Sequence, residues 1–442
     1  MRNIITYLLL LLPVLSFGQS VTEKLDAYLT ASADAGLFSG SALIVEKNNV
    51  ILNKGYGYKD VLAKTRNDAH TIYQLGSITK QFTAAIILKL EEQKKLKIKD
   101  KLSKYFPDFP NADKITLEHL LTHTSGIFNI TRDTSLSQEK PTNQEIIFAA
   151  LKVKPLDFEP GTRYRYNNTG YIILGYIIEQ VTGKKYEQVV REQILVPLQM
   201  NNTGFDFKNL KHSDKSVGYN FIADGRGFKS PMTDSTFSFS AGAMYSTLAD
   251  LDKWNQALQN GTVLKKSSLK NAFTPRLAGY GLGWKMDTIA YKPVIAHTGL
   301  ITGFKSYNIM LPESNTRIIL LSNFSSFNEA KAAKDLVSIL TGQPYELPKE
   351  GTEVKVDEAI LKQYVGEYQF SSTAYIKIRL ENGQLKGQAS GQPEVDLFAK
   401  SEKDFFLKAA DIQLEFVKNE KGEVEKLITY QGGRARTGIK VK

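Results

Sequence analysis

Apolar and polar positions alternate in two groups of short segments that lie far apart in the chain. In the first group, Ser41–Glu46 and Val50–Tyr58 flank the turn Lys47-Asn48-Asn49, and this pattern predicts a hairpin. In the second group a strand is followed by another hairpin. The strands predicted there are Val294–His297, Ser306–Leu311 and Arg317–Ser322. Strands from both ends of one region predict a single antiparallel sheet that both ends build.

Helical periodicity dominates the chain between these two groups of strands. The segments with apolar residues at helical spacing are Asn143–Leu151, Gly170–Thr182, Tyr186–Ile194, Leu248–Leu258 and, after the second hairpin, Glu329–Leu340. Helices inserted between strands of one sheet indicate an α+β fold with an inserted helical lobe. A cleft between sheet and lobe is the expected place for a small-molecule site.

Strand-like alternation returns after Leu347, beyond a segment rich in proline, glycine and charge. Tyr375–Leu380 alternates, Asn382-Gly383 predicts a tight turn, and Gln384–Gln388 returns. Three more runs continue the pattern, namely Asp404–Leu407, Ile412–Val417 and Val424–Tyr430. We therefore expect a linker over residues 346–355 and a separate all-β domain, barrel or sandwich, over residues 356–442.

The first residues have the pattern of a secretory signal peptide. Arg2 precedes an apolar run from Ile4 to Phe17, and small residues stand at Ser16 and Gly18. The run is shorter than the roughly 20 residues that a membrane span needs, although an uncleaved anchor is an alternative. We expect residues 1–18 to be removed, the mature protein to have no stable membrane span, and its location to be periplasmic or secreted.

Composition narrows the possible partners. The formal net charge is +11, the chain has no cysteine, and the positive excess lies before Gly351. Without cysteine there is no disulfide and no thiolate site. The basic residues form no run with interleaved aromatics, so a nucleic-acid partner is not expected. The charge could instead attract anionic cell-wall polymer or a membrane surface.

The tetrapeptide Ser77-Ile78-Thr79-Lys80 is the leading candidate for chemistry. A serine hydroxyl needs a base to become nucleophilic, and a lysine three positions later in a helix lies on the same face. Ser137–Lys140 and Ser267–Lys270 have the same spacing, but only Ser77 follows a strand-like run and a glycine. A helix starting at Ser77 would aim free N–H groups at the reacting centre. The alternative is a helix-capping serine.

Two further stretches could complete a site. Tyr166 and Asn168 lie two apart in a loop bounded by proline and glycine, where the phenol could share a proton with Lys80 and the amide could bind substrate. His297 and Gly299 end a predicted strand that a substrate could lie beside. The alternatives are a buried tyrosine with a turn asparagine, and a structural histidine.

Together these stretches resemble the three active-site motifs of serine β-lactamases of class C and the related DD-peptidases, esterases and D-aminopeptidases. The matching residues are Ser77-Ile78-Thr79-Lys80, Tyr166-Asn167-Asn168 and His297-Thr298-Gly299, in the same order and at similarly wide spacing. Supporting stretches begin at Ile115, Pro197, Ala241 and Tyr280. The resemblance implies a serine hydrolase domain over residues 19–345. The tail is similar to barrel-like domains appended to such hydrolases.

The resemblance also implies roles. Ser77 would be acylated, and Lys80 and Tyr166 would exchange protons with it. Asn168 would bind the substrate amide, with His297, Thr298, Gly299 and Leu300 forming the substrate-binding strand. The backbone N–H groups of Ser77 and Leu300 would form the oxyanion hole. No cofactor and no metal are implied, and we do not expect His119 and His123 to form a metal pair despite their spacing.

This sequence departs from the family pattern in its third motif, where His297 stands in place of a lysine. A lysine keeps a positive charge for a substrate carboxylate, whereas histidine is mostly neutral at pH 7. The favoured hypothesis is an exported hydrolase of amides or D-amino-acid peptides of cell-wall origin, like a DD-carboxypeptidase or D-aminopeptidase, with peptidoglycan fragments among its partners. The alternatives are a carboxylesterase or weak β-lactamase, and a non-catalytic scaffold with a relict hydrolase lobe.

Overall fold

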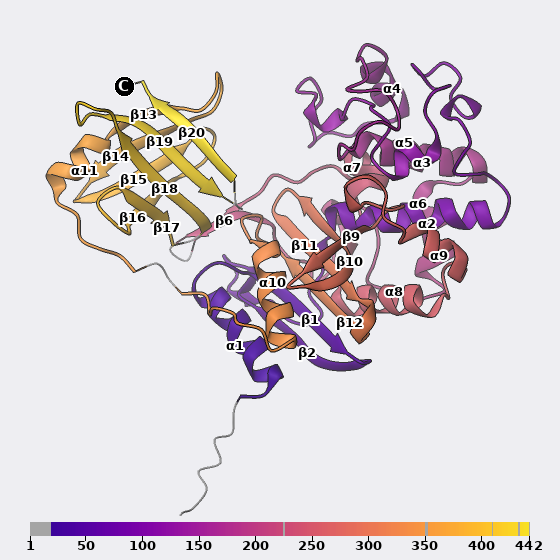
Figure 1. The fold of residues 1–442 in the computed structure, drawn as a ribbon, viewed down its shortest axis with the longest axis horizontal. Coiled ribbons are helices and arrows are strands. Elements are labelled where there is room, and N and C mark those ends of the chain that lie inside the picture. The colour runs from indigo at the N-terminus through magenta and orange to yellow at the C-terminus, as the bar shows by residue number, and fades with distance from the viewer. Residues whose placement is uncertain (1–18, 224–225, 350–351, 409, 432–433, 442) are drawn as a thin grey trace, which may run out of the picture.

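The computed structural model describes residues 19–223, 226–349, 352–408, 410–431 and 434–441. The predicted signal peptide, residues 1–18, lies outside these described residues. Three assemblies make up the described chain: a central sheet with its covering helices, a helical lobe and a C-terminal barrel (Figure 1). Within the described ranges, the helices are all too short or too polar to cross a membrane.

The central sheet has six antiparallel strands in the order β2-β1-β12-β11-β10-β9. The strands are β1 (Gly40–Glu46), β2 (Asn49–Tyr56), β9 (Lys285–Ile289), β10 (Lys292–Ile301), β11 (Phe304–Leu311) and β12 (Thr316–Ser322). Strand β1 pairs with β12, with Leu43 opposite Ile319. The prediction of one sheet built from both chain ends is therefore confirmed, and β9 is an addition to it.

The turn between β1 and β2 shows why the first hairpin forms at the predicted place. Lys47 and Asn48 both have positive φ angles, 49° and 67°. Two consecutive positive φ angles match the tight hairpin turn whose twist suits the flanking strands. Alternate residues of β1 then point to opposite faces of the sheet, so both faces have to be covered.

Helices cover both faces of the sheet. On one face α1 (Val21–Asp34) and α10 (Glu329–Leu340) pack against Ile44 and its neighbours. On the other face α2 (Thr79–Glu92) and α8 (Leu248–Asn260) pack against Val45. The rings of Phe82 on α2 and Trp254 on α8 stack with centroids 4.2 Å apart. The sheet thus supports α2, the helix that carries Lys80, on a fixed apolar layer.

The helical lobe lies between β2 and β9 in the chain. Its helices are α3 (Leu117–Leu121), α4 (Gln144–Lys152), α5 (Asn168–Thr182), α6 (Tyr186–Val190), α7 (Ser235–Gly242) and α9 (Lys266–Ala272). Short strand pairs also occur between β2 and β9. They are β3 (Tyr58–Asp60) with β4 (Thr65–Arg66), β5 (Tyr73–Gln74) with β8 (Tyr245–Ser246), and β6 (Tyr219–Ala223) with β7 (Arg226–Lys229). The helix predicted at Tyr186–Ile194 is shorter than expected, because a π-helical turn follows α6 from Arg191.

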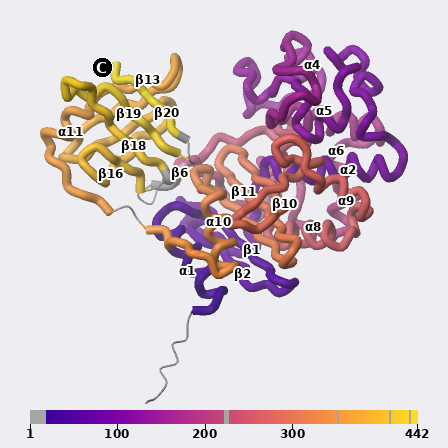
Figure 2. The backbone as a smooth tube through the Cα atoms, viewed as in Figure 1, coloured from indigo at the N-terminus to yellow at the C-terminus, as the bar shows by residue number. Residues whose placement is uncertain are grey.

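The C-terminal domain is a closed antiparallel barrel of eight strands, which decides between the barrel and the sandwich in favour of the barrel. Helix α11 (Glu358–Tyr364) precedes it. The strands are β13 (Gly366–Gln369), β14 (Tyr375–Glu381), β15 (Gln384–Ala389), β16 (Glu394–Ala399), β17 (Asp404–Leu407), β18 (Ala410–Lys418), β19 (Val424–Gln431) and β20 (Arg434–Lys440). Tyr364 and Phe416 stack in its core with centroids 4.1 Å apart. Figure 2 shows the barrel as a body apart from the lobe of α4 and α5.

Candidate active site

Ser77 lies in a 3₁₀ turn, Gly76–Ile78, directly before α2. The sequence predicts a helix that starts at Ser77 itself, whereas α2 begins two residues later, at Thr79. Gly76 has a φ of +54°, and a side chain there would meet backbone atoms of Leu300 at 2.9 Å. Only glycine allows both this conformation and this close approach. The turn therefore packs Gly76, the residue before Ser77, directly against the end of β10.

Lys80 is fully buried one turn beyond Ser77. Its Nζ lies 2.9 Å from Ser77 Oγ, 2.8 Å from Asn168 Oδ1 and 2.8 Å from the carbonyl oxygen of Ala241. Burial lowers the pKa of Lys80 well below its usual value of 10.5. Desolvation disfavours the charged form of an amine, so this lysine is disposed to lose its proton.

Tyr166 lies beside this pair, with its ring centroid 4.9 Å from Lys80 Nζ. Its hydroxyl oxygen is buried and has no hydrogen bond of regular geometry within the described structure. Burial raises the pKa of Tyr166, and the nearby Ser77 hydroxyl only partly offsets that rise. A cation beside a phenol would lower its pKa, but here burial sets the direction and the pKa of Tyr166 rises.

Asn168 begins α5, and the preceding Asn167 caps this helix by accepting a hydrogen bond from the Gly170 N–H. The cap fixes the loop that carries Tyr166 and Asn168. Asn129 supports the same loop, because its Oδ1 accepts a hydrogen bond from the Asn168 N–H at 3.3 Å. With its Oδ1 bound by Lys80, Asn168 has its Nδ2 group left as a donor.

The third predicted stretch lies on β10 and its residues alternate in exposure. His297 and Gly299 are buried, whereas Thr298 and Leu300 are exposed. A Cβ on Gly299 would lie 1.9 Å from the carbonyl oxygen of Leu75. Strand β9 pairs with β10 only as far as Ala296, so the strand from His297 onward has no β9 partner. This end of β10 is a free strand edge beside Ser77.

His297 turns away from solvent and bonds to Tyr280. Its Nε2 lies 2.7 Å from the Tyr280 hydroxyl, and its Nδ1 lies 2.6 Å from the carbonyl oxygen of Thr298. A carbonyl only accepts, so Nδ1 carries the proton and Nε2 accepts from Tyr280. Burial, together with the nearby Lys80, lowers the pKa of His297 to about 3. His297 is thus a neutral member of a hydroxyl network.

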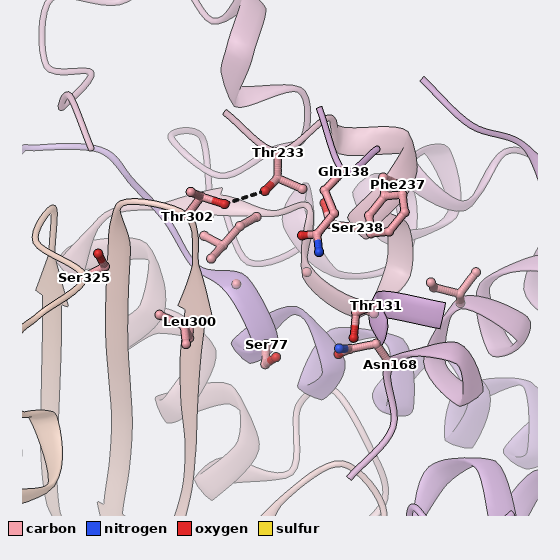
Figure 3. Close-up of a pocket in the computed structure, with 15 residues that line it drawn as sticks. Ser77, Thr131, Gln138, Asn168, Thr233, Phe237, Ser238, Leu300, Thr302 and Ser325 are labelled. Carbon is pink, nitrogen blue, oxygen red and sulfur yellow. Dashed lines mark hydrogen bonds between the residues drawn. The ribbon is translucent and has the colours of Figure 1, made fainter. Parts of the chain in front are cut away.

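A cavity of about 390 Å³ opens over Ser77. Ser77, Asn168 and Leu300 line it, and Figure 3 shows their side chains between the end of β10 and the helical lobe. Thr131, Thr233 and Phe237 form part of its wall in the lobe. The structure thus brings together the predicted serine, lysine, tyrosine and asparagine, and it sets His297 behind them.

Sequence reasoning assigned no role to two residues that organise the site. His123 is buried against the Tyr166 ring, with centroids 4.2 Å apart, and its Nδ1 accepts a hydrogen bond from the Asn167 N–H at 3.1 Å. Tyr280 bonds His297. Both belong to stretches that support the family resemblance, so a signal for them existed. Ala241 also begins such a stretch, but its contact with Lys80 is made by a backbone carbonyl, which the residue type does not reveal.

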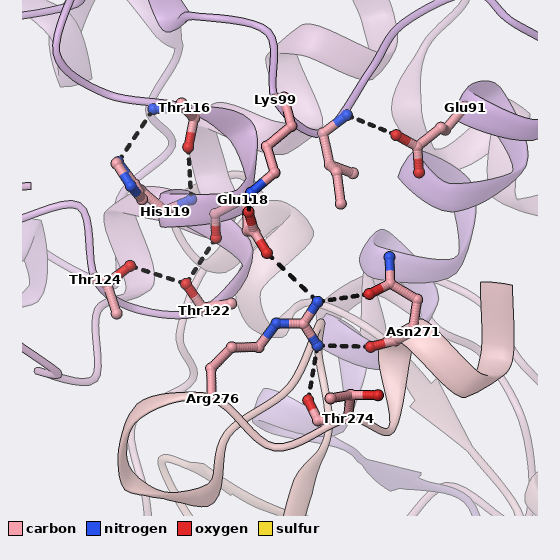
Figure 4. A network of polar contacts seen from close by, with 11 residues as sticks. Glu91, Lys99, Thr116, Glu118, His119, Thr122, Thr124, Asn271, Thr274 and Arg276 are labelled. Atoms are coloured by element: carbon pink, nitrogen blue, oxygen red, sulfur yellow. Dashed lines mark hydrogen bonds and ion pairs between the residues drawn. The ribbon is translucent and has the colours of Figure 1, made fainter. Parts of the chain in front are cut away.

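A polar network around Glu118 and Arg276 lies next to the segment that carries Tyr280, and Figure 4 shows its two central residues. Glu118 on α3 pairs with Lys99 and with Arg276, whose Nη2 lies 3.4 Å from Glu118 Oε1. Arg276 also donates to the carbonyl oxygens of Asn271 and Thr274. The Arg276 N–H donates to the carbonyl of Tyr280 at 3.1 Å. The network therefore connects α3, α9 and the segment that carries Tyr280.

The fold and this site define a serine hydrolase in which Ser77 is paired with the buried Lys80. The chain belongs to the beta-lactamase family, whose model matches residues 23–342. A second model, described as a domain of unknown function (DUF3471), matches residues 351–438, which cover the barrel except for the end of β20.

Named relatives agree with this assignment. Penicillin-binding protein 4* of Bacillus subtilis is 28% identical over 96% of this chain and 100% of its own length. The putative penicillin-binding protein PbpX of the same organism is 33% identical over 70% of this chain and 75% of its own.

Solved structures extend the likeness to the fold. An octameric penicillin-binding protein homologue from Pyrococcus abyssi matches with a TM-score of 0.65 and 26% identity, over 94% of this chain and 99% of that one. The D-amino acid amidase of Ochrobactrum anthropi matches with a TM-score of 0.65 over 73% of this chain and 99% of that one. At 21% identity, the second likeness concerns the fold alone.

Proposed function

We propose that this protein hydrolyses amide or peptide bonds through an acyl-enzyme formed on Ser77. The observation that carries the proposal is the 2.9 Å contact between Ser77 Oγ and the buried Lys80 Nζ, whose pKa is lowered. A neutral amine has two N–H donors and one lone pair. Asn168 and Ala241 take the two donors, so the lone pair faces Ser77 and accepts its hydroxyl proton.

Tyr166 is proposed to pass the proton onward. Because burial raises its pKa, the phenol keeps its own proton near neutral pH and can donate it to a leaving amine. Lys80 would then replace that proton with the one taken from Ser77. In this scheme Lys80 acts first as base, Tyr166 then acts as acid, and a water molecule releases the acyl group.

The oxyanion hole is proposed to consist of the backbone N–H groups of Ser77 and Leu300. The close contact of Gly76 with Leu300 supports this pairing, because it brings the two backbone segments to one point beside Oγ. A preorganised donor of this kind contributes about 2.7–4 kcal/mol to the transition state. The Nδ2 group of Asn168, which lines the cavity, would bind the substrate carbonyl.

The proposed natural substrates are D-amino-acid peptides of cell-wall type, met after export from the cell. Support comes from the signal-peptide pattern of residues 1–18 and from relatives that are named penicillin-binding proteins. Ester hydrolysis is a second candidate. The observation that favours it is the neutral, buried His297, which offers no charge to a peptide carboxylate.

Covalent labelling tests the proposed acyl-enzyme. A fluorophosphonate probe is expected to add to Ser77, with the adduct located by mass spectrometry of the digested protein. Ser77→Ala should lose both the adduct and the turnover of amide and ester substrates. Ser267→Ala, which removes the serine of a tetrapeptide with the same spacing, is the matched control and should keep both. An adduct that persists in Ser77→Ala would overturn the proposal.

A further inference from the structure

Among the residues that the structure describes, those that line the cavity over Ser77 include no charged side chain. Hydroxyl and amide groups form its polar part, among them Thr131, Gln138, Thr233 and Thr302, and Figure 3 shows Thr233 and Thr302 joined by a hydrogen bond. Aliphatic and aromatic side chains form the remainder. A pocket of this composition offers hydrogen bonds and apolar contact, but no ion pair.

Charged residues that stand next to these lining residues in the sequence do not line the cavity themselves. Arg132, which follows Thr131, pairs with Asp157 at 2.6 Å. Asp234, which follows Thr233, caps α7 by accepting hydrogen bonds from the N–H and hydroxyl of Thr236. Glu139 and Lys140 follow Gln138 with opposite charges, and neither lines the cavity.

The two basic groups nearest to the reacting centre are also committed. Three oxygen atoms surround Lys80 Nζ, those of Ser77, Asn168 and Ala241. His297 has both ring nitrogens bonded within the protein, and only 4% of its surface is exposed. Neither is therefore free to neutralise a carboxylate on a bound substrate.

A charged group that enters such a cavity loses its water without gaining an ion partner, which is costly. A neutral amide or ester exchanges its few hydrogen bonds with water for those of the wall at little net cost. We infer that the part of the substrate held in this cavity is uncharged: an ester, or a peptide whose terminal carboxylate or ammonium is amidated, acylated or distant from the cleaved bond.

This inference rests on the proposed hydrolysis at Ser77 and narrows its substrates. It excludes release of a free C-terminal residue that is recognised through its carboxylate, and removal of a free N-terminal residue that is recognised through its ammonium. What it favours is cleavage within a peptide, or cleavage of a blocked one.

Matched p-nitrophenyl esters test the inference. In the first pair, the mono-p-nitrophenyl ester of adipic acid, which has a free carboxylate, is compared with the same compound as its methyl ester. In the second pair, p-nitrophenyl 6-aminohexanoate, which has a free ammonium, is compared with its N-acetyl derivative. Each pair has the same leaving group and nearly the same size. The assay contains 0.5 M NaCl, which screens the overall positive charge of the protein. The neutral member of each pair is expected to have the higher kcat/KM, by at least about tenfold. A charged ester within threefold of its neutral partner would overturn the inference.

Variants of Gln138 provide the converse measurement, because this residue lines the cavity and is exposed, so its substitution is expected to leave the fold intact. Gln138→Lys should raise the carboxylate-to-methyl-ester ratio of kcat/KM at least about fivefold, and Gln138→Glu should do the same for the ammonium ester. Unchanged ratios in both variants would contradict the inference.

Fluorophosphonate labelling of Ser77 is measured in parallel. A labelled Ser77 with a preference for charged esters defeats only this inference, whereas an unlabelled Ser77 defeats the proposed function.

Discussion

Two buried histidines, His123 and His297, show how single residues set the limits of this site. Burial lowers the pKa of both, that of His297 to about 3. His123 is packed among tyrosine rings and makes its hydrogen bond to the Asn167 N–H only as a neutral ring. Neutral histidines keep positive charge away from Lys80, which helps that lysine to remain an amine.

A pH-dependent loss of stability follows from these two residues. Below pH 6.5 the unfolded chain binds protons that the folded histidines do not, so the free energy of unfolding falls as the pH falls. His297 is expected to contribute a slope of about 1.4 kcal/mol per pH unit between pH 6 and pH 4.5, and His123 adds to it in the same direction. Urea unfolding at several pH values measures this slope.

Substitution identifies the source of the slope. His297→Asn should make it shallower by about 1.4 kcal/mol per pH unit, since one of the two groups no longer titrates. An equal slope in His297→Asn and in the unmodified protein would show that His297 is not held neutral.

At the scale of elements, the contact between the Gly76–Ile78 turn and β10 decides the geometry of the site. Both elements meet through glycine, Gly76 on the turn and Gly299 on the strand. Ser306 on β11 adds a hydrogen bond to the carbonyl of Leu75 at 2.7 Å. Backbone segments held so closely leave no room for a side chain between them.

Gly299→Ala should therefore inactivate the enzyme without unfolding it. Its new methyl group would lie 1.9 Å from the carbonyl oxygen of Leu75, so the strand has to move away from Ser77. Loss of one oxyanion donor lowers kcat by about 100-fold or more. Steady-state kinetics with a p-nitrophenyl ester, together with circular dichroism, measure both effects.

Gly387→Ala is the matched control for this prediction. It lies in a barrel strand, and its added methyl group would meet only flexible side-chain atoms of Leu397, at 3.3 Å. Its kcat should equal that of the unmodified protein. Full activity in Gly299→Ala would contradict the proposed role of the Leu300 N–H.

Sequence patterns predicted elements better than they predicted contacts. Helix α10 begins and ends where apolar periodicity places it, and β17 does so as well. Strand β9 escaped prediction because its exposed positions give no alternation of burial. The hydrogen bond between Tyr280 and His297 also escaped it, because hydrogen bonds between distant segments depend on the final packing. The motif residues could be named in advance, but the direction of the Tyr166 pKa could not, since burial is a property of the folded chain.

At the scale of the whole molecule, the barrel has a core of its own. Among the residues that the structure describes, its buried side chains, including Tyr364, Tyr368 and Phe416, form one cluster without a residue of the hydrolase region. Within the same described part of the chain, the two clusters on either side of the central sheet contain no residue of the barrel. Separate cores are expected of domains that fold independently.

A chain that ends at Leu347 should consequently fold and remain active. Turnover of a small p-nitrophenyl ester is expected to stay within about twofold of that of the full chain. Calorimetry of the full chain should show two unfolding transitions, of which the truncated chain keeps one. Loss of Ser77 labelling on truncation would mean that the barrel takes part in the site.

The pairing of strands from both ends of the hydrolase region also governs when the enzyme can first act. Ser306 and Leu75, which are bonded beside the nucleophile, stand 231 residues apart in the chain. A ribosome adds about 5–20 residues per second, so β11 is made about 10–50 s after the serine turn. Throughout that interval the nascent polypeptide carries its nucleophile without the strand that would activate it. Newly made molecules are therefore expected to be catalytically silent at least until β11 has been made.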